Sequence, residues 1–182
     1  DSGFVPMSNP FNISCPHAEI GTDPAYGLLA GQGNHSISTA DVDGDGCMEI
    51  VYGAACLDHD GSLLYSSYGN LPDGRRAKFG HGDSMHVADI DPDSPGLDIF
   101  NVYEEGANAP YGWAMRDAET GEPRFGEYFE GDLGRCMIGK IDPATRGLQV
   151  WVQDVRDCRG NVLPLKPPST NMKIYWAGDL ST

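Results

Sequence analysis

Short apolar runs alternate with acidic and glycine-rich stretches along most of the chain. Residues 37–40 and 50–52 are predicted strands on either side of an acidic loop, and a turn at 57–61 leads into a further strand at 63–65. The same order of strand, acidic loop, strand, Asp-to-Gly turn and strand then recurs twice. In these later copies the strands that flank the acidic loops are predicted at 85–88, 98–103, 135–141 and 148–153. Because no long run has a helical period, the pattern predicts antiparallel strands joined by tight turns.

The repeated unit is marked by an acidic phrase. Its copies begin at Ala40, Ala88 and Gly139, and a fourth copy, cut short, begins at Gly178. A spacing of roughly 40–50 residues is typical of β-propeller blades. The chain is therefore predicted to be all-β, with about three propeller blades, the start of a fourth, and calcium loops. The alternative is a β-sandwich, but sandwich strands do not usually repeat the chemistry of their loops.

The repeats also divide the chain. Residues 32–182 are expected to be consecutive blades of one incomplete domain. Residues 1–31 are rich in Pro, Asn and Gly without a clear period, and are expected to be a loop or the end of a preceding unit.

Composition and charge narrow the function classes. The 182 residues include 24 Gly and 13 Pro, which suits many short strands and turns. A net charge of -15 excludes a general binder of nucleic-acid backbones, and it fits either divalent cations or an acidic soluble surface. No stretch is long and apolar enough to suggest a membrane partner. The five cysteines are odd in number and lack metal-type spacing, so most are expected to be buried and unpaired.

The first acidic loop has the spacing of a calcium site. Asp41, Asp43 and Asp45 alternate, and Glu49 follows four residues later. Alternate carboxylates on a curled backbone point to one centre, and Ca²⁺ prefers several oxygens that include a backbone carbonyl. Cys47 would supply that carbonyl. These five residues are therefore predicted calcium ligands, and the alternative is a solvated acidic turn.

The second loop keeps part of this pattern. Asp89, Asp91 and Asp98 are predicted metal ligands, with Asp93 as a possible addition.

The third loop has lost most of its negative charge. It keeps Asp142, but Lys140 stands where the first aspartate would be and Gln149 where the last acid would be. The ammonium group of Lys140 is expected to replace the bound cation.

Two histidines and two carboxylates form a separate candidate site. His35 precedes the first loop, His81 and Asp83 precede the second, and Glu104 follows the strand that leaves the second loop. Equivalent places in successive units should lie on one rim, so the four side chains can meet. By their chemistry alone they suggest Zn²⁺ or Mn²⁺ before Ca²⁺, although a lone histidine is more often structural.

Several motifs occur in one order over about residues 26–182. They are Gly31-Gln32-Gly33-Asn34-His35, the loop 40–49, Gly80-His81-Gly82-Asp83, Ala109-Pro110-Tyr111-Gly112, Leu133-Gly134-Arg135, Pro168-Ser169-Thr170-Asn171 and Trp176-Ala177-Gly178-Asp179-Leu180. This series resembles polysaccharide lyase family 11, the rhamnogalacturonan lyases. The resemblance implies an internal segment of an eight-bladed, calcium-rich propeller. It also implies secretion, and a substrate with alternating rhamnose and galacturonate, the rhamnogalacturonan I backbone of pectin.

The resemblance also implies roles for individual residues. The family equivalents of His35, His81, Asp83 and Glu104 hold a calcium ion at the substrate cleft, and that of Arg135 lines the cleft. Further substrate contacts are expected from Asn34 and Tyr111.

Two features depart from the family pattern. One is the third loop, with its lost acids. The other is the segment between Tyr68 and Phe79, which is longer than expected and carries Arg75, Arg76 and Lys78. These cations either reach the anionic substrate or belong to a solvated loop.

The implied reaction removes the C5 proton of galacturonate and expels the C4 oxygen. A divalent cation and Arg135 would offset the charge that grows on the carboxylate. The candidates for the base that takes the proton are His86, Lys78 and Arg135, and a part of the propeller outside this chain is the alternative. An arginine base is costly because guanidinium holds its proton tightly. The 182 residues alone are therefore expected to be inactive.

Two other function classes remain open from the sequence. One is a calcium-stabilised propeller segment that binds pectin without chemistry. The other is a structural or adhesion array of calcium blades. The His81-Gly82-Asp83 run argues against the second, because calcium blades need no imidazole.

Overall fold

Short antiparallel strands make up the fold. The computed structural model describes residues 27–167, which contain strands β1 to β13 and one 3-10 helix, η1 (Gly106–Asn108), but no α-helix. The all-β class predicted from the sequence is confirmed for these residues. Within them, no helix is long and apolar enough to cross a membrane.

Each of the three copies of the repeat builds one antiparallel sheet, with its strands in chain order. The strands of the first sheet are β1 (Ser38–Ala40), β2 (Glu49–Val51), β3 (Ala55–Leu57) and β4 (Leu63–Ser66). Those of the second are β7 (Met85–Ala88), β8 (Asp98–Val102), β9 (Trp113–Asp117) and β10 (Pro123–Glu127). Those of the third are β11 (Met137–Gly139), β12 (Gln149–Trp151) and β13 (Val155–Arg156). The fourth copy of the acidic phrase lies outside the described residues.

The acidic loops and the Asp-to-Gly turns fall at equivalent places in these sheets. Each acidic loop joins the first two strands, and in the first two sheets the turn joins the last two. The sequence pattern missed the third strand of each sheet, β3, β9 and β13. Only three residues separate β3 from β2. The long segment after Tyr68 pairs with itself as a hairpin, β5 (Tyr68–Asn70) and β6 (Arg76–Lys78).

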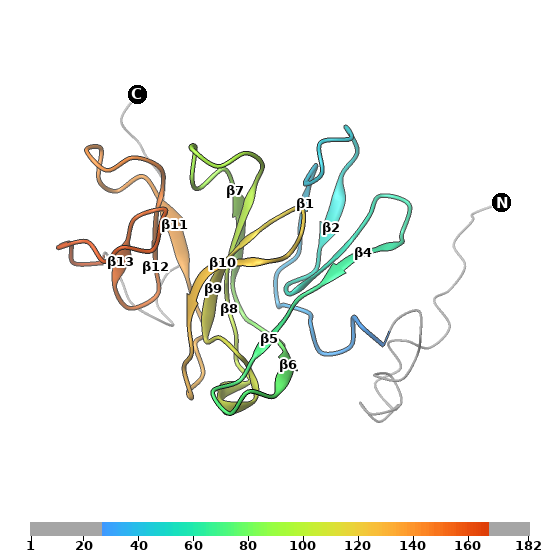
Figure 1. The fold of residues 1–182 in the computed structure, drawn as a ribbon. Coiled ribbons are helices and arrows are strands. Elements are labelled where there is room, and N and C mark those ends of the chain that lie inside the picture. Colours follow the sequence, from blue (N-terminus) through green and yellow to red (C-terminus); the bar gives the residue numbers. More distant parts are fainter. Residues whose placement is uncertain (1–26, 168–182) are drawn as a thin grey trace.

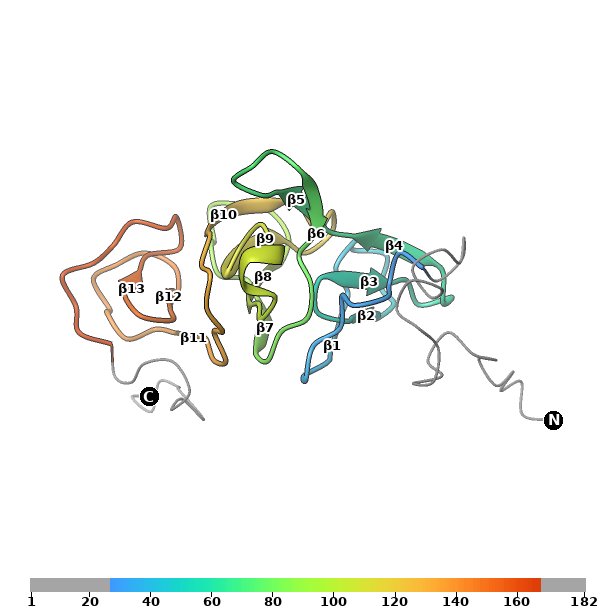
Figure 2. The ribbon, with the colours of Figure 1, turned by 90° about the horizontal axis from the view of Figure 1, so that it is seen from below.

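The three sheets lie side by side in chain order, as both ribbon views show (Figures 1 and 2). β7 contacts β1 on one side and β11 on the other. The first strands of all three sheets are therefore neighbours, and segments that precede those strands are brought together. The candidate histidines lie in such segments.

Apolar side chains fill the spaces between sheets. β8 is buried along its whole length because its alternate residues face opposite sides. Ile99 packs with Val51 and Cys56 of the first sheet, whereas Phe100 packs with Val150 of the third. The middle sheet is thus covered on both faces, which explains its nearly continuous apolar run.

The described cysteines are unpaired. Cys56, Cys136 and Cys158 are buried, as expected, whereas Cys47 is exposed in the first acidic loop. Cys15 lies outside the described residues.

Candidate metal and substrate site

One buried side chain closes the base of each acidic loop. Glu49 accepts the backbone N–H of Val42 at 2.7 Å, and Asp98 accepts that of Asp91 at 2.9 Å. Gln149 accepts the N–H of Asp142 at 2.8 Å. An amide oxygen can accept these bonds as well as a carboxylate does. The replacement of an acid by Gln149 therefore keeps the loop shape while it removes the charge.

The first loop gathers three carboxylates. Oxygen atoms of Asp41, Asp43 and Asp45 lie within 4.8 Å of one another. Asp41 also accepts the N–H groups of Gly44 and Gly46, at 2.8 and 3.1 Å, which curls the backbone around the group. Glu49 is separate from this group, because it closes the base of the loop.

The second loop is neutralised by arginines. Arg124 Nε lies 3.0 Å from a buried oxygen of Asp98. Arg146 and Arg159, which come from the third unit, contact Asp93 at 2.5 and 2.8 Å. The hydrogen bond from Arg146 holds the pKa of Asp93 below its ordinary value.

The structure does not gather the predicted ligands of the second loop. Within residues 27–167, no three carboxylates of that loop lie as close together as those of the first. Arginine side chains lie beside Asp98 and Asp93 here, and the role of Asp89, Asp91 and Asp98 as metal ligands stays a prediction.

The third loop has the arrangement expected of Lys140. Its ammonium group donates to the carbonyl oxygens of Thr145 and Gly147, the latter at 3.1 Å. Asp142 is held instead by the N–H of Ala144 and the hydroxyl of Thr145. The ammonium group of Lys140 thus occupies the side of this loop that is lined by backbone carbonyls.

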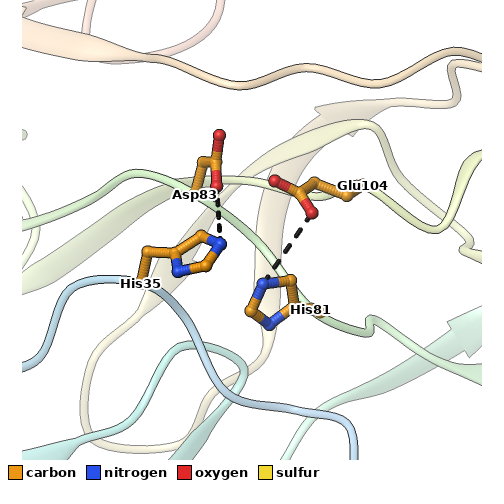
Figure 3. A group of neighbouring side chains, drawn as sticks. All are labelled: His35, His81, Asp83 and Glu104. Atoms are coloured by element: carbon orange, nitrogen blue, oxygen red, sulfur yellow. Dashed lines mark ion pairs between the residues drawn. The ribbon is translucent and has the colours of Figure 1, made fainter.

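The four residues of the second candidate site converge (Figure 3). Donor atoms of His35, His81, Asp83 and Glu104 all lie within 4.8 Å of one another. His35 Nε2 is 3.2 Å from Asp83 Oδ1, and His81 Nε2 is 3.8 Å from Glu104 Oε2. The two imidazole rings meet edge to face with centroids 4.7 Å apart. We call these four residues the His-carboxylate cluster.

Backbone pairing brings the two histidine segments together. Asn34 and Gly82 form a parallel bridge, and His35 N–H donates to the Gly82 carbonyl at 3.0 Å. Glu104 N–H donates to the carbonyl of His81 at 2.9 Å. A side chain at Gly82 would meet the carbonyl oxygen of Val102, so only glycine allows this close approach.

Two buried polar side chains hold the backbone around the His-carboxylate cluster. Gln32 accepts the N–H of Gly80 at 2.8 Å and donates to the Ser67 carbonyl at 2.6 Å. Arg116 donates to the carbonyl of Gly53 at 2.6 Å and to Asn101 Oδ1 at 3.3 Å. Both side chains are fully buried.

Asn101 extends this support to the second histidine segment, because it donates to the carbonyl of Ser84 at 3.0 Å. Sequence reasoning missed Arg116 and Asn101. Gln32 entered only as part of a motif, and no local pattern marks any of the three.

The two carboxylates of the cluster shift each other's pKa. Hydrogen bonding to Asp83, and then burial, raises the pKa of Glu104 to about 7. Burial acts to raise the pKa of Asp83, but hydrogen bonds from Glu104 and Arg135 outweigh it and lower that pKa. Arg135 Nη1 donates to Asp83 Oδ2 at 2.6 Å. The cluster is therefore negative but partly neutralised, with a guanidinium at its edge.

Comparisons with known proteins identify the family of this chain. Residues 20–182 match the family model described as "Rhamnogalacturonan lyase family 11, C-terminal domain". The chain belongs to rhamnogalacturonan lyase family 11. It is 45% identical over 168 residues to the rhamnogalacturonan exolyase YesX of Bacillus subtilis (strain 168). It is 44% identical over 154 residues to the rhamnogalacturonan endolyase YesW of the same organism.

Solved structures of this family share the fold. The Bacillus licheniformis rhamnogalacturonan lyase PL11 aligns with a TM-score of 0.73 and 45% identity, over 88% of this chain and 26% of that one. A crystal structure of YesW aligns with a TM-score of 0.72 and 42% identity, over 87% of this chain and 26% of that one. The alignments with YesX and YesW cover 86% and 84% of this chain, and 26% and 23% of those relatives. The chain thus spans about a quarter of these lyases.

The remaining site residues predicted for this family member lie in different surroundings. Lys78 donates to the carbonyls of Gly27 and Ala30, at 2.8 and 2.6 Å, and burial lowers its pKa. His86 Nε2 is 3.1 Å from the Cys136 carbonyl, and burial lowers its pKa as well.

The two predicted substrate contacts, Tyr111 and Asn34, also lie in different surroundings. Tyr111 packs against Phe79 with ring centroids 5.0 Å apart. Asn34 is next to His35 and has a buried amide nitrogen without a hydrogen-bond partner. Of the predicted catalytic and substrate residues, Arg135 and Asn34 adjoin the His-carboxylate cluster.

Proposed function

We propose that this chain supplies part of the catalytic centre of a rhamnogalacturonan lyase, which cleaves the rhamnose-galacturonate backbone by β-elimination. The observation that supports this most directly is the His-carboxylate cluster with Arg135 beside it. The cluster is built from three segments that ordinary sheet packing would not require to carry ionisable groups. Family membership agrees with the proposal.

We further infer that the three sheets are successive blades of a β-propeller. In a propeller the innermost strands of neighbouring blades surround a common axis. The contacts from β7 to both β1 and β11 fit this arrangement. The rest of the ring, eight blades by the family pattern, would come from the remainder of the enzyme and cover the outer faces of this segment.

The cluster is a suitable holder for one divalent ion. Two imidazoles and two carboxylates lie within 4.8 Å of one another, a spacing that matches donors around a single centre. We propose that His35, His81, Asp83 and Glu104 hold Ca²⁺. When bound there, the ion would offset negative charge that develops on the galacturonate carboxylate.

The residues around this position have their own tasks in the proposed reaction. Arg135 donates charge-assisted hydrogen bonds to the substrate carboxylate, while Asp83 holds the guanidinium at the edge of the cluster. Asn34 offers its unpartnered amide nitrogen beside His35. As a ligand of the cation, Glu104 would have to be deprotonated.

Two residues of this chain, Lys78 and His86, remain candidates for the base that takes the C5 proton. Lys78 and His86 are both held by backbone carbonyls and both have lowered pKa values, which favours the neutral, proton-accepting form. Neither is part of the cluster, so a base from another part of the enzyme remains part of the proposal. Arg135 is assigned to binding.

The test is the release of unsaturated sugar from rhamnogalacturonan by the 182-residue chain and by the same chain joined to the rest of the family propeller. The joined protein should be active with calcium, and His81→Ala should lower turnover about 10–100-fold. Glu119→Gln, in an exposed turn, is the matched control. Binding of the polysaccharide without release by the joined protein would favour the non-catalytic alternative.

A further inference from the structure

The hairpin of β5 and β6 belongs to the end of the sheets that carries the His-carboxylate cluster. Figure 1 shows it at the end opposite the acidic loops. β6 ends three residues before His81. A Cβ atom at Gly69 of β5 would lie 2.8 Å from the ring of Pro110, which is in the same loop between β8 and β9 as Glu104. The hairpin is therefore part of the surface around the cluster.

Strand alternation divides the side chains of this hairpin between two faces. Gly69 lies on the face that packs against Pro110. Tyr68, Arg76 and Lys78 lie on the opposite face, because side chains alternate along each strand. Backbone carbonyls hold Lys78, whereas the exposed Arg76 has its guanidinium over the Tyr68 ring, 5.0 Å from the centroid. Arg76 is thus the cation that this face presents to solvent.

Arg76 differs from the other solvent-accessible arginines of residues 27–167, because no carboxylate forms an ion pair with it. Each of the others lies within salt-bridge distance of at least one carboxylate: Arg75, Arg124, Arg135, Arg146, Arg156 and Arg159. An unpaired guanidinium is unexpected in a chain with 27 acidic residues and a net charge of -15. Tyr68 orients this guanidinium without neutralising it.

An oriented and accessible guanidinium is suited to bind a carboxylate. Its planar donors match both carboxylate oxygens, and the aromatic ring beside it offers an apolar surface to a sugar. The net negative charge of the chain repels a polyanion. An anionic polysaccharide is therefore expected to contact this part of the chain where a cation is unpaired. A backbone of alternating rhamnose and galacturonate offers one carboxylate in every second sugar.

We propose that Arg76, oriented by Tyr68, binds the carboxylate of a galacturonate unit away from the bond that is cleaved. Arg76 is at the end of β6 far from His81, so the contact is separate from the one proposed for Arg135. The inference rests on the proposed function, because it takes rhamnogalacturonan as the bound polysaccharide. Its consequence is that Arg76 contributes to the binding of long chains and not to the chemical step.

The kinetic experiment uses the 182-residue chain joined to the rest of the family propeller, with long rhamnogalacturonan chains and short fragments as substrates. Arg76→Gln should raise KM for long chains about three- to tenfold and leave kcat within about twofold. Fragments too short to reach the hairpin should show unchanged kcat/KM. The effect on long chains should shrink at about 1 M salt, because salt screens exposed charges.

Three further variants test the geometry of the contact. Arg146→Gln is the matched control, because it removes the same charge from an arginine that is 66% exposed, at the acidic-loop end of the sheets, and it should leave KM unchanged. Arg76→Lys keeps the charge without the planar donors and should recover part of the affinity. Tyr68→Leu should raise KM in the same direction as Arg76→Gln. An equal KM in wild type and Arg76→Gln, or an equal rise in Arg146→Gln, would overturn the proposal.

A binding measurement separates this inference from the proposed function. Affinity electrophoresis in gels that contain rhamnogalacturonan compares wild type with Arg76→Gln whether or not the joined protein is active. Weaker binding by Arg76→Gln in a protein without activity would support the contact and contradict the lyase proposal. Equal binding in an active protein would overturn the contact alone, and no binding by wild type would overturn both. Carboxyl-reduced rhamnogalacturonan should bind both proteins equally if the carboxylate is the partner of Arg76.

Discussion

The side-chain oxygen of Gln32 accepts a hydrogen bond of 2.8 Å from the backbone N–H of Gly80, the residue before His81. Gln32 lies three residues before His35, and its amide nitrogen donates to the Ser67 carbonyl at 2.6 Å. One buried side chain therefore fixes the segments of both histidines against the first sheet.

Substitution of Gln32 should loosen the His-carboxylate cluster. Gln32→Ala leaves buried groups without partners and should lower the free energy of unfolding by about 1–3 kcal/mol. It should also weaken divalent-metal affinity at the cluster about 10–100-fold, by analogy with other residues that orient metal ligands. Thermal unfolding and calorimetric metal titration measure the two effects. Unchanged metal affinity in a folded Gln32→Ala protein would contradict this role.

Arg124 should be far more important for stability than the other arginines of the second loop. Its partner Asp98 is 1% exposed, and a buried charge that loses its partner costs about 3–5 kcal/mol. Arg124→Leu should therefore destabilise the protein strongly, and Asp98→Asn in the same chain should recover part of the loss. Arg146→Leu is the control: its side chain is 66% exposed, so its loss should cost less than about 1 kcal/mol. Urea unfolding of the four proteins distinguishes these outcomes.

Calcium should stabilise the protein through the first acidic loop and not through the third. Carboxylates that gather without a cation repel one another, and an ion that binds only the folded state adds about 2.7 kcal/mol at a concentration 100 times its Kd. Chelation should lower the melting temperature and calcium should restore it. Asp41→Asn should reduce this response, whereas Asp142→Asn should not. A response that disappears in Asp142→Asn would mean that the third loop binds the ion despite Lys140.

The metal-free protein should lose stability as the pH rises toward neutrality. The pKa of Glu104 is raised from its ordinary 4.5 to about 7 in the folded state, first by its hydrogen bond to Asp83. The folded state thus binds the proton more tightly than the unfolded state does. This contribution is full below about pH 4.5 and is lost as the pH rises through about 7. Chemical unfolding from pH 4.5 to 8 with a chelator measures it, and Glu104→Gln should flatten that part of the profile.

Much of the fold could be predicted from local sequence. Strand β7 was predicted at its observed bounds, and β8 to within one residue, because alternation and Asp-to-Gly turns act over a few positions. Lys140 was also predicted correctly to provide the cation of the third loop, since the charges that changed there are neighbours in sequence. The third strand of each sheet was missed: β3 is only three residues long and follows β2 closely, and β9 and β13 were not predicted either.

The meeting of His35 with His81 was predicted from the repeat, which places equivalent segments on one rim. The repeat could not show Gln32 or Arg116, because their partners lie in different sheets. Nor could it show the arginines at the second loop: Asp89, Asp91 and Asp98 have the spacing of ligands, and Arg124, Arg146 and Arg159 come from elsewhere in the chain to balance that region. Equally, the sequence places His59 in a turn, whereas the structure places its Nδ1 atom close to oxygens of Asp58 and Asp45.

The sequence by itself determined the all-β class, the repeated units and the side chains available for metal binding, because each depends on period and composition. Only the tertiary structure decided which charged side chains lie next to one another. Arg124 of β10 reaches Asp98, and His59 of a turn reaches Glu49, because strand pairing brings these later segments back to the acidic loops. Gln32 reaches Gly80 because two sheets pack. Electrostatic pairing depends on distances of a few ångströms in a low-dielectric interior, and those distances follow from packing and not from spacing along the chain.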